Sequence, residues 1–147
     1  LNEVAVLKKD TSSMIKIEAY VDDEFLNTYW ADGLIVSTPT GSTGYSLSCG
    51  GPIIAPGTNN IIITPIAQHN LNVRPIVINH NSTVKLKVED RDELALVSLD
   101  SCSRAFDSSV VLTIKKANFK INLIEPQNNT FISTVRQKLM WGSDKRN

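Results

Sequence analysis

Short stretches in which apolar and polar residues alternate recur along this chain, and they restrict its fold more than any other feature. Residues 84–88 (VKLKV) alternate strictly. In residues 14–21 every second side chain is apolar, at Ile15, Ile17, Ala19 and Val21. A period of two predicts β-strands with one buried face. The polar residues 22–24 then predict a turn, and residues 25–29 a returning strand, so that this region forms a hairpin.

Further apolar runs of strand length follow at short intervals. Polar breaks at residues 79–82, 89–92 and 101–103 separate several of them. Short strands at regular spacing, without alternating helices, predict a mainly β fold, either a sandwich or a barrel. The remaining predicted strands are residues 3–7, 34–37, 60–64, 75–79, 94–99, 110–115 and 119–124.

Two helices are expected among the strands. The first begins near residues 41–43, covers residues 45–48 and ends at the Gly-Gly-Pro of residues 50–52. The second runs from Ser133, which we expect to be its N-cap, to Met140. Val135 and Leu139 then share one face of this helix.

Length and charge exclude several classes of protein. The chain has 147 residues, enough for one domain with a core, and 41% of them are hydrophobic. Lys plus Arg and Asp plus Glu both number 15, which argues against a protein held to nucleic acid by bulk charge. No apolar run approaches the roughly 20 residues of a membrane helix, and no signal peptide opens the chain. We therefore expect neither nucleic acid nor membrane as a partner.

The two cysteines, Cys49 and Cys102, lie far apart and match no metal-binding spacing. We expect reduced thiols in a cytoplasmic protein, with no metal site formed by this chain alone. The first residue is Leu1 rather than Met, and a predicted strand starts almost at once. We expect this chain to be a piece of a longer protein.

The stretch most suited to bind a ligand is residues 37–52, STPTGSTGYSLSCGGP, which follows the apolar residues 32–36. Glycines let a ligand approach the backbone, and hydroxyls both donate and accept hydrogen bonds. The N–H groups that begin the predicted helix favour polar or phosphate ligands. No Lys follows the glycines, so this is not a Walker-type loop, and the spacing is not the Rossmann fingerprint. The alternative is a plain glycine-rich connection from strand to helix.

Residues 32–52 resemble the long signature segment of NAD kinases. Three further blocks of that family occur in order: Asn-Glu at residues 2–3, PIAQHNL with RPIVI at residues 65–78, and SLDS at residues 98–101. Together the four blocks extend from residue 2 to residue 101. Kinases acting on diacylglycerol or sphingosine share the ancestral fold but are not expected to match residues 32–52 this closely.

The resemblance implies a fold and an activity. NAD kinases pair an amino-terminal α/β domain, which holds a catalytic Gly-Gly-Asp-Gly motif, with a carboxy-terminal β-sandwich that binds NAD. They phosphorylate the 2′-hydroxyl of the adenosine ribose with ATP or polyphosphate and a divalent metal ion, Mg or Mn, and give NADP. Since this chain contains no Gly-Gly-Asp-Gly, residues 1–147 resemble the carboxy-terminal domain alone, and we expect no catalytic residue and no activity from this part by itself.

The resemblance also implies which residues bind NAD. Asn2 corresponds to the residue that reads the adenine, Glu3 to the one that holds ribose hydroxyls, and Asp32 to an acidic residue near the nicotinamide. Ala67 corresponds to a small residue that closes the pocket, often from a neighbouring subunit. The family forms homodimers and homotetramers, and its tail, residues 131–147 here, returns to the amino-terminal domain. The remaining expected NAD-binding residues are Thr43, Gly44, Tyr45, Ser46, Leu47, Ser48 and Cys102.

The sequence departs from the family at three positions, and some residues fit other roles. Gly44 stands where the family commonly has Ala, Trp30 where it often has a basic residue, and Cys102 where many members have Gln. Tyr45 could instead be a core residue, and Asp100 could cap a turn. A different class of function also fits the composition, namely a non-catalytic β-sandwich that binds a ligand or a partner protein.

Overall fold

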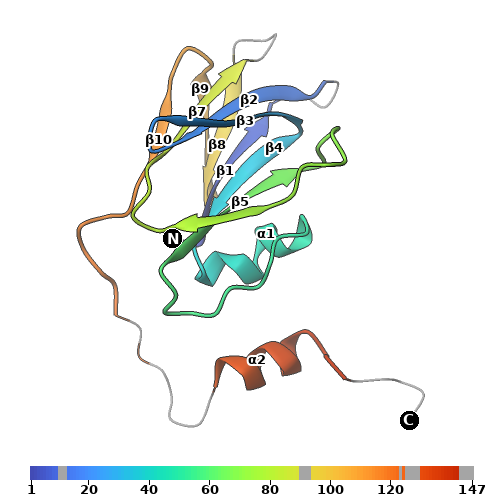
Figure 1. The fold of residues 1–147 in the computed structure, drawn as a ribbon, viewed down its shortest axis with the longest axis vertical. Coiled ribbons are helices and arrows are strands. Elements are labelled where there is room, and N and C mark those ends of the chain that lie inside the picture. The colour runs from blue at the N-terminus through green and yellow to red at the C-terminus, as the bar shows by residue number, and fades with distance from the viewer. Residues whose placement is uncertain (10–12, 90–93, 123, 125–129, 143–147) are drawn as a thin grey trace. The chain divides into compact units, whose positions relative to one another are not determined.

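The computed structural model describes residues 1–9, 13–89, 94–122, 124 and 130–142. The chain divides into two compact units, residues 1–116 and residues 117–147, which are described separately below. All strands of the described residues lie in the first unit (Figure 1).

The strands of the first unit form two antiparallel sheets. Sheet A has six strands in the order β6-β5-β4-β1-β8-β9, and sheet B has four in the order β10-β7-β2-β3. The mainly β architecture of two sheets is thereby confirmed. The strands are β1 (Glu3–Lys8), β2 (Ile15–Val21), β3 (Glu24–Ala31), β4 (Gly33–Ser37), β5 (Asn60–Ile66), β6 (Ile76–Asn79), β7 (Val84–Glu89), β8 (Leu94–Leu99), β9 (Cys102–Asp107) and β10 (Leu112–Ile114).

The main core lies between the two sheets and follows the predicted alternation. Ile15, Ile17 and Ala19 of β2 are buried in it, whereas Lys16 and Glu18 point to the opposite face. Sheet A supplies Val6, Leu34, Val36, Ile63 and Ala95 to the same core.

Sheet A also buries part of its other face, which we call its outer face. Ala5, Ile35 and Ile66 form a second cluster there, against which Leu7 and Cys49 pack. Because β4 is covered on both faces, all five of its residues are buried. This explains why it reads as a continuous apolar run rather than as an alternating strand.

The hairpin predicted from the sequence is confirmed, with a tighter turn. Val21 pairs with Glu24, so Glu24 already belongs to β3 and the turn consists of Asp22 and Asp23. Their φ angles are 51° and 69°. Two-residue turns of this left-handed kind match the twist of the strands they join, and Asp tolerates the conformation.

Two strand predictions in the last third of the chain are wrong. Residues 101–103 are not a simple break, because Cys102 begins β9. This strand lies at the edge of sheet A and is mostly exposed, so it lacks the apolar pattern that predicts a strand. Residues 119–122 and 124 form no strand; Phe119 and Ile121 are 70% and 74% exposed, and a strand needs a neighbour to pair its backbone. Residue 123 lies outside the described residues. The predicted strand at 110–115 is shorter, since β10 covers only Leu112–Ile114.

The first predicted helix consists of two short pieces. A 3-10 turn, η1 (Thr40–Thr43), is followed after Gly44 by α1 (Tyr45–Ser48). α1 lies alongside β5 (Figure 1), where Ser46 Oγ and Thr64 Oγ1 are 2.9 Å apart. This segment therefore covers part of the outer face of sheet A.

The second unit contains α2 (Phe131–Lys138), which begins earlier than predicted. Its N-cap is Thr130 rather than Ser133. The Ser133 N–H donates to Thr130 Oγ1 at 3.1 Å, and the Thr130 N–H donates to Ser133 Oγ at 3.2 Å. Ser133 is thus the third helical residue of a capping box, and its side chain accepts the N–H of the N-cap residue. Among the described residues, no helix has the length and apolarity needed to cross a membrane.

Candidate functional site

Three of the four sequence blocks meet at one end of sheet A. β1 begins at Glu3 opposite Ser37, the last residue of β4, and Val4 pairs with Leu99, the last residue of β8. Because neighbouring strands run in opposite directions, the start of β1 lies between the ends of β4 and β8. We call this the β1-start end of sheet A.

The loop after β4 is bound to the backbone of Asn2. The Thr38 N–H donates to the Asn2 carbonyl at 2.9 Å, and Thr38 Oγ1 donates to the same oxygen at 3.1 Å. Gly41 packs directly on this residue, since a Cβ at Gly41 would lie 2.1 Å from the Asn2 carbonyl oxygen. Glycine is required here because the two backbones approach too closely for any side chain.

Asp100 holds the start of β1 from the other side. It lies in the two-residue turn between β8 and β9 with a φ of 52°. Its Oδ1 accepts the backbone N–H of Asn2 at 2.8 Å and that of Glu3 at 3.0 Å. Both bonds lower the pKa of Asp100, and the bond from Glu3 has the larger effect. Asp100 does occupy a turn, as the simpler interpretation allowed, but its carboxylate binds a neighbouring strand.

Two hydroxyls of the η1–α1 segment are used inside the protein. Ser42 Oγ donates to the Pro39 carbonyl at 2.6 Å and accepts the Ile54 N–H at 3.0 Å. Ser46 is fully buried and pairs with Thr64. The predicted stretch of residues 43–48 is therefore divided: Ser46 points inward and Leu47 is half-buried, while the exposed members are Thr43, Gly44, Tyr45 and Ser48.

Glu3 and Ser37 each hold a buried oxygen without a hydrogen-bond partner among the described residues. The atoms are Glu3 Oε2 and Ser37 Oγ, and the two residues face each other across β1 and β4. A Cβ at Gly44 would lie 3.4 Å from Glu3 Oε2, so the carboxylate is next to this exposed glycine. Burial, then the charge of Asp100, raises the pKa of Glu3, whereas a hydrogen bond from the backbone N–H of Tyr45 to its carboxylate lowers it. Buried oxygens without a protein partner are rare, and water, an ion or a ligand can satisfy them.

Asp32 and Ala67 lie at the opposite end of the same strands. The Asp32 N–H donates to the Ile66 carbonyl at 3.0 Å, and Ala67, which is exposed, follows directly with a φ of 44°. The Asp32 carboxylate pairs with Lys8 at 2.6 Å between Oδ1 and Nζ.

Tyr45 is the first residue of α1 and its side chain is exposed. Burial raises the pKa of its hydroxyl, and the charges of Cys49, Asp32 and Glu3 raise it further. Because Tyr45 is 41% exposed, the alternative that it is a core residue is wrong.

Cys102 does not join this cluster. It pairs with Leu99, which pairs with Val4, and directly paired residues of a sheet share a face. That face is the one directed at sheet B, whereas Glu3 lies on the outer face. Cys102 is thus exposed at the β1-start end but on the other side of the sheet. Neither cysteine is in a disulfide.

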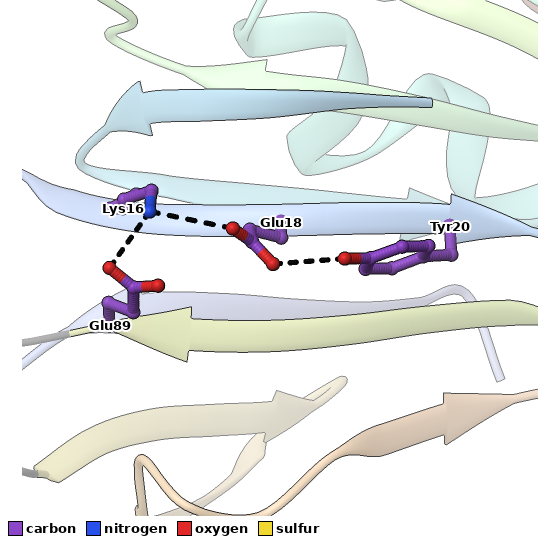
Figure 2. Close-up of polar contacts among 4 residues, drawn as sticks. All are labelled: Lys16, Glu18, Tyr20 and Glu89. Carbon is purple, nitrogen blue, oxygen red and sulfur yellow. Dashed lines mark hydrogen bonds and ion pairs between the residues drawn. The ribbon is translucent and has the colours of Figure 1, made fainter. Parts of the chain in front are cut away.

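The outer face of sheet B contains more charges but differs in character (Figure 2). Lys16 Nζ lies 2.9 Å from Glu89 Oε2 and 3.4 Å from Glu18 Oε1, and the Tyr20 hydroxyl donates to Glu18 Oε2 at 3.0 Å. The bond to Glu89 raises the pKa of Lys16, and the bond from Tyr20 lowers that of Glu18. Each group of this network has a partner, so the network needs no ligand.

The sequence did not identify Ser37, Thr38 or Thr64 as site residues. Ser37 and Thr38 lie inside the signature stretch, but nothing local shows that Ser37 faces Glu3 or that Thr38 binds Asn2. Thr64 interrupts an isoleucine-rich strand, which is the one signal that an inward-facing hydroxyl has a partner.

Comparison with known families and proteins gives consistent matches. Residues 1–126 match the family model of the ATP-NAD kinase C-terminal domain. The chain is 60% identical over 147 residues to an NAD kinase of Flavobacterium psychrophilum and 50% identical over 146 residues to one of Bacteroides fragilis. All or nearly all of the chain is covered in these matches, but only 50% of each relative. The chain thus spans about half the length of the curated relatives it matches.

Solved structures agree with the sequence matches. An NAD kinase from Archaeoglobus fulgidus in complex with ATP superimposes with a TM-score of 0.74 at 35% identity, covering 81% of this chain and 46% of that one. Yeast NADH kinase complexed with NADH superimposes with a TM-score of 0.80 at 26% identity, covering 97% of this chain and 44% of that one.

Proposed function

The chain belongs to the ATP-NAD kinase C-terminal domain family, and from this premise we propose that it binds the acceptor dinucleotide of an NAD kinase. The parent protein then phosphorylates the 2′-hydroxyl of the adenosine ribose of NAD, with ATP or polyphosphate as donor, and takes part in NADP biosynthesis. The names of the relatives and the ATP and NADH complexes of the similar structures support this proposal.

The observation that supports it most is the unpaired Oε2 of Glu3 beside exposed Gly44. A buried carboxylate oxygen without a donor is unfavourable, and hydroxyl groups of a ribose would supply the missing hydrogen bonds. In this proposal Glu3 accepts from the ribose, and Asn2, next to it, reads the adenine with an amide that donates and accepts.

The remaining dinucleotide would extend along the exposed side of the η1–α1 segment. We assign Thr43, Gly44, Tyr45 and Ser48 to its wall, with Ser46 and Leu47 supporting that wall from below. Asp32 would meet the nicotinamide end, since it lies at the end of β4 far from Ser37, and Ala67, which follows β5 next to it, would close the pocket. A role for Cys102 rests on the family resemblance alone.

The chemistry would need groups from elsewhere in the parent. We propose that the other half supplies the Gly-Gly-Asp-Gly motif, and that residues 131–147 pack on that domain. Among the described residues, no three His, Cys, Asp or Glu side chains converge as metal ligands. The divalent metal ion would therefore arrive with the nucleotide phosphates, whose charge it neutralises. A cytoplasmic homodimer or homotetramer completes the proposal.

The test uses the full-length parent protein and calorimetric titration with NAD. Replacing Glu3→Ala should weaken NAD binding by about tenfold or more, because charge-assisted hydrogen bonds are lost. Glu18→Ala, an equal change in the partnered network of sheet B, is the matched control and should leave NAD affinity unchanged. Wild-type protein that fails to make NADP from NAD with either donor would overturn the proposed activity. Wild-type affinity in Glu3→Ala would overturn the proposed site.

A further inference from the structure

We propose that Asp100 is a positioning residue, which fixes the backbone of Asn2 and Glu3 so that both side chains meet the dinucleotide. This inference rests on the proposed function. It assigns to the β8–β9 turn a role in affinity for NAD, although Asp100 is not expected to touch the dinucleotide.

Asp100 holds the start of β1 through its carboxylate and its own backbone N–H. Asp100 Oδ1 accepts the N–H groups of Asn2 at 2.8 Å and of Glu3 at 3.0 Å, and the Asp100 N–H donates to the Glu3 carbonyl at 3.3 Å. Three hydrogen bonds from one residue therefore define where β1 begins. A carboxylate acceptor makes two of them stronger than ordinary backbone bonds.

Thr38 holds the same segment from the opposite side. Its N–H donates to the Asn2 carbonyl at 2.9 Å, and its Oγ1 donates to that oxygen at 3.1 Å. The backbone N–H of Asn2 is thus bound by the β8–β9 turn, and its carbonyl by the loop after β4. A residue held at both backbone polar groups has a fixed backbone, so the point from which its side chain projects is fixed as well.

The chain contains a chemical twin of Asp100 far from this site. Asp22 has a φ of 51°, its Oδ1 accepts the Thr83 N–H at 2.8 Å, and its own N–H donates to the Thr83 carbonyl at 2.9 Å. It caps the start of β7 as Asp100 caps the start of β1. The two turns differ in what they hold, because no proposed site residue follows Thr83. Asp22 is therefore a matched control for every change at Asp100.

Asp100 also affects Glu3 through its charge. The titratable groups that interact with Glu3 are Asp100, Tyr45 on α1 and Cys49 just after it. The negative charge of Asp100 contributes to the raised pKa of Glu3. An uncharged residue at position 100 would let Glu3 ionise at lower pH, and an ionised Glu3 accepts hydroxyl hydrogen bonds best.

The experiment compares three variants of the full-length parent by steady-state kinetics with NAD and by thermal unfolding. Asp100→Gly removes the carboxylate but keeps a residue that tolerates positive φ. Asp100→Asn keeps the oxygen acceptor and that tolerance but removes the charge. Asp22→Gly is the control. We expect Asp100→Gly to raise the KM for NAD about tenfold or more, with kcat within about threefold of wild type.

The other two variants separate geometry from charge and from stability. Asp100→Asn should keep the KM within about twofold of wild type, because its acceptor remains, while the pH profile of kcat/KM shifts to lower pH. Asp22→Gly should lower the unfolding temperature and leave the KM unchanged. An unchanged KM in Asp100→Gly, or an equal rise in Asp22→Gly, would overturn the role of Asp100.

If Asp100→Gly fails to fold, the Asp100→Asn variant alone tests the role of Asp100. A wild-type KM with the shifted profile supports the proposal, and a KM raised tenfold or an unshifted profile contradicts it. The wild-type protein separates the proposed function from the role of Asp100. If it makes NADP but the variants behave otherwise than expected, only the role of Asp100 is wrong. If it makes no NADP, the proposed function is wrong.

Discussion

The outer faces of the two sheets show opposite ways of placing polar groups. On sheet B, Lys16, Glu18, Tyr20 and Glu89 are joined to one another at the surface (Figure 2). On sheet A, the η1–α1 segment covers the start of β1, and Glu3 and Ser37 are left with buried oxygens that have no partner among the described residues. Sheet B has more charge on its outer face, yet sheet A has the unmet hydrogen-bonding capacity. The number of charged residues and the absence of a hydrogen-bond partner therefore point to different faces, and the proposed binding site lies on the face with the unpaired oxygens.

The difference arises from what covers each face. Gly41 lets the η1–α1 segment approach the backbone of Asn2, just before β1, until backbone atoms touch, and Gly51 lets the chain after α1 pack closely on Ser46. The oxygens of Glu3 and Ser37 below the η1–α1 segment are buried without a partner among the described residues, and in the proposed function a ligand pairs with Glu3. On sheet B, solvent and long side chains satisfy every group named above. Substitutions on the outer faces of the two sheets test this contrast.

The largest effect is expected from Gly41→Ala. The new Cβ would lie 2.1 Å from the Asn2 carbonyl oxygen, a backbone atom that cannot move alone. We expect the free energy of unfolding to fall by about 2–4 kcal/mol and NAD binding to be lost. Urea denaturation and calorimetry on the full-length parent measure both.

Gly44→Ala is the control in the same loop. The nearest atoms to its added Cβ are the Gly41 carbonyl oxygen at 3.3 Å and Glu3 Oε2 at 3.4 Å. Its effect on unfolding should be clearly smaller than that of Gly41→Ala. Equal destabilisation by the two changes would mean that close packing on Asn2 is not what this end of sheet A requires.

The second-largest loss of stability is expected from changes in the buried pair Ser46–Thr64. Each of Ser46→Ala and Thr64→Val leaves one hydroxyl buried without its partner, and each should lower the free energy of unfolding by about 1–3 kcal/mol. The double change should be less destabilising than the sum of the two, because no unpaired hydroxyl remains. Strict additivity in urea denaturation would show that the two hydroxyls do not depend on each other.

A smaller effect concerns pH, and here the two aspartates Asp22 and Asp100 differ in sign from Glu3. Hydrogen bonds lower the pKa of both Asp22 and Asp100, so their contribution to stability is present above the pKa of the unfolded state and is lost as pH falls through the folded value. Glu3 has a raised pKa, so its contribution is present at low pH and is lost as pH rises through its folded value.

Unfolding measured as a function of pH separates the two signs. Asp22→Asn and Asp100→Asn should both flatten the loss of stability below about pH 4. Glu3→Gln should flatten the decline that begins near the unfolded pKa of a glutamate, about 4.3, and should therefore stabilise the protein at neutral pH. A destabilised Glu3→Gln variant at neutral pH would contradict the raised pKa.

The smallest effect is expected on sheet B. Lys16→Met removes the centre of the network in Figure 2, but solvent can replace exposed ion pairs. The unfolding temperature should change less than in any variant above, and the KM for NAD should stay within about twofold of wild type. A large rise in KM would place a functional surface on sheet B and reverse the contrast between the faces.

Local pattern was enough to predict most of the strands. Residues 15–21 alternate because only one of their faces is buried, and Asp22-Asp23 form a turn because Asp adopts positive φ easily. The same reasoning failed for β9, whose exposed residues show no alternation, and for residues 119–122 and 124, which include apolar side chains but form no strand in the described part of the chain. Strand formation depends on a partner that the local sequence does not reveal.

The residue types and their order in the four blocks were enough to identify the family and to name Asn2, Glu3 and the exposed residues of the η1–α1 segment. The pairing of β1 with β4 and β8 decided the rest. It put Ser37 opposite Glu3, brought the Asp100 carboxylate to the Asn2 and Glu3 backbones from nearly 100 residues away, and put Cys102 on the other face. Such relations follow from sheet register, which is set by the burial of every strand together and so cannot be read from any one segment.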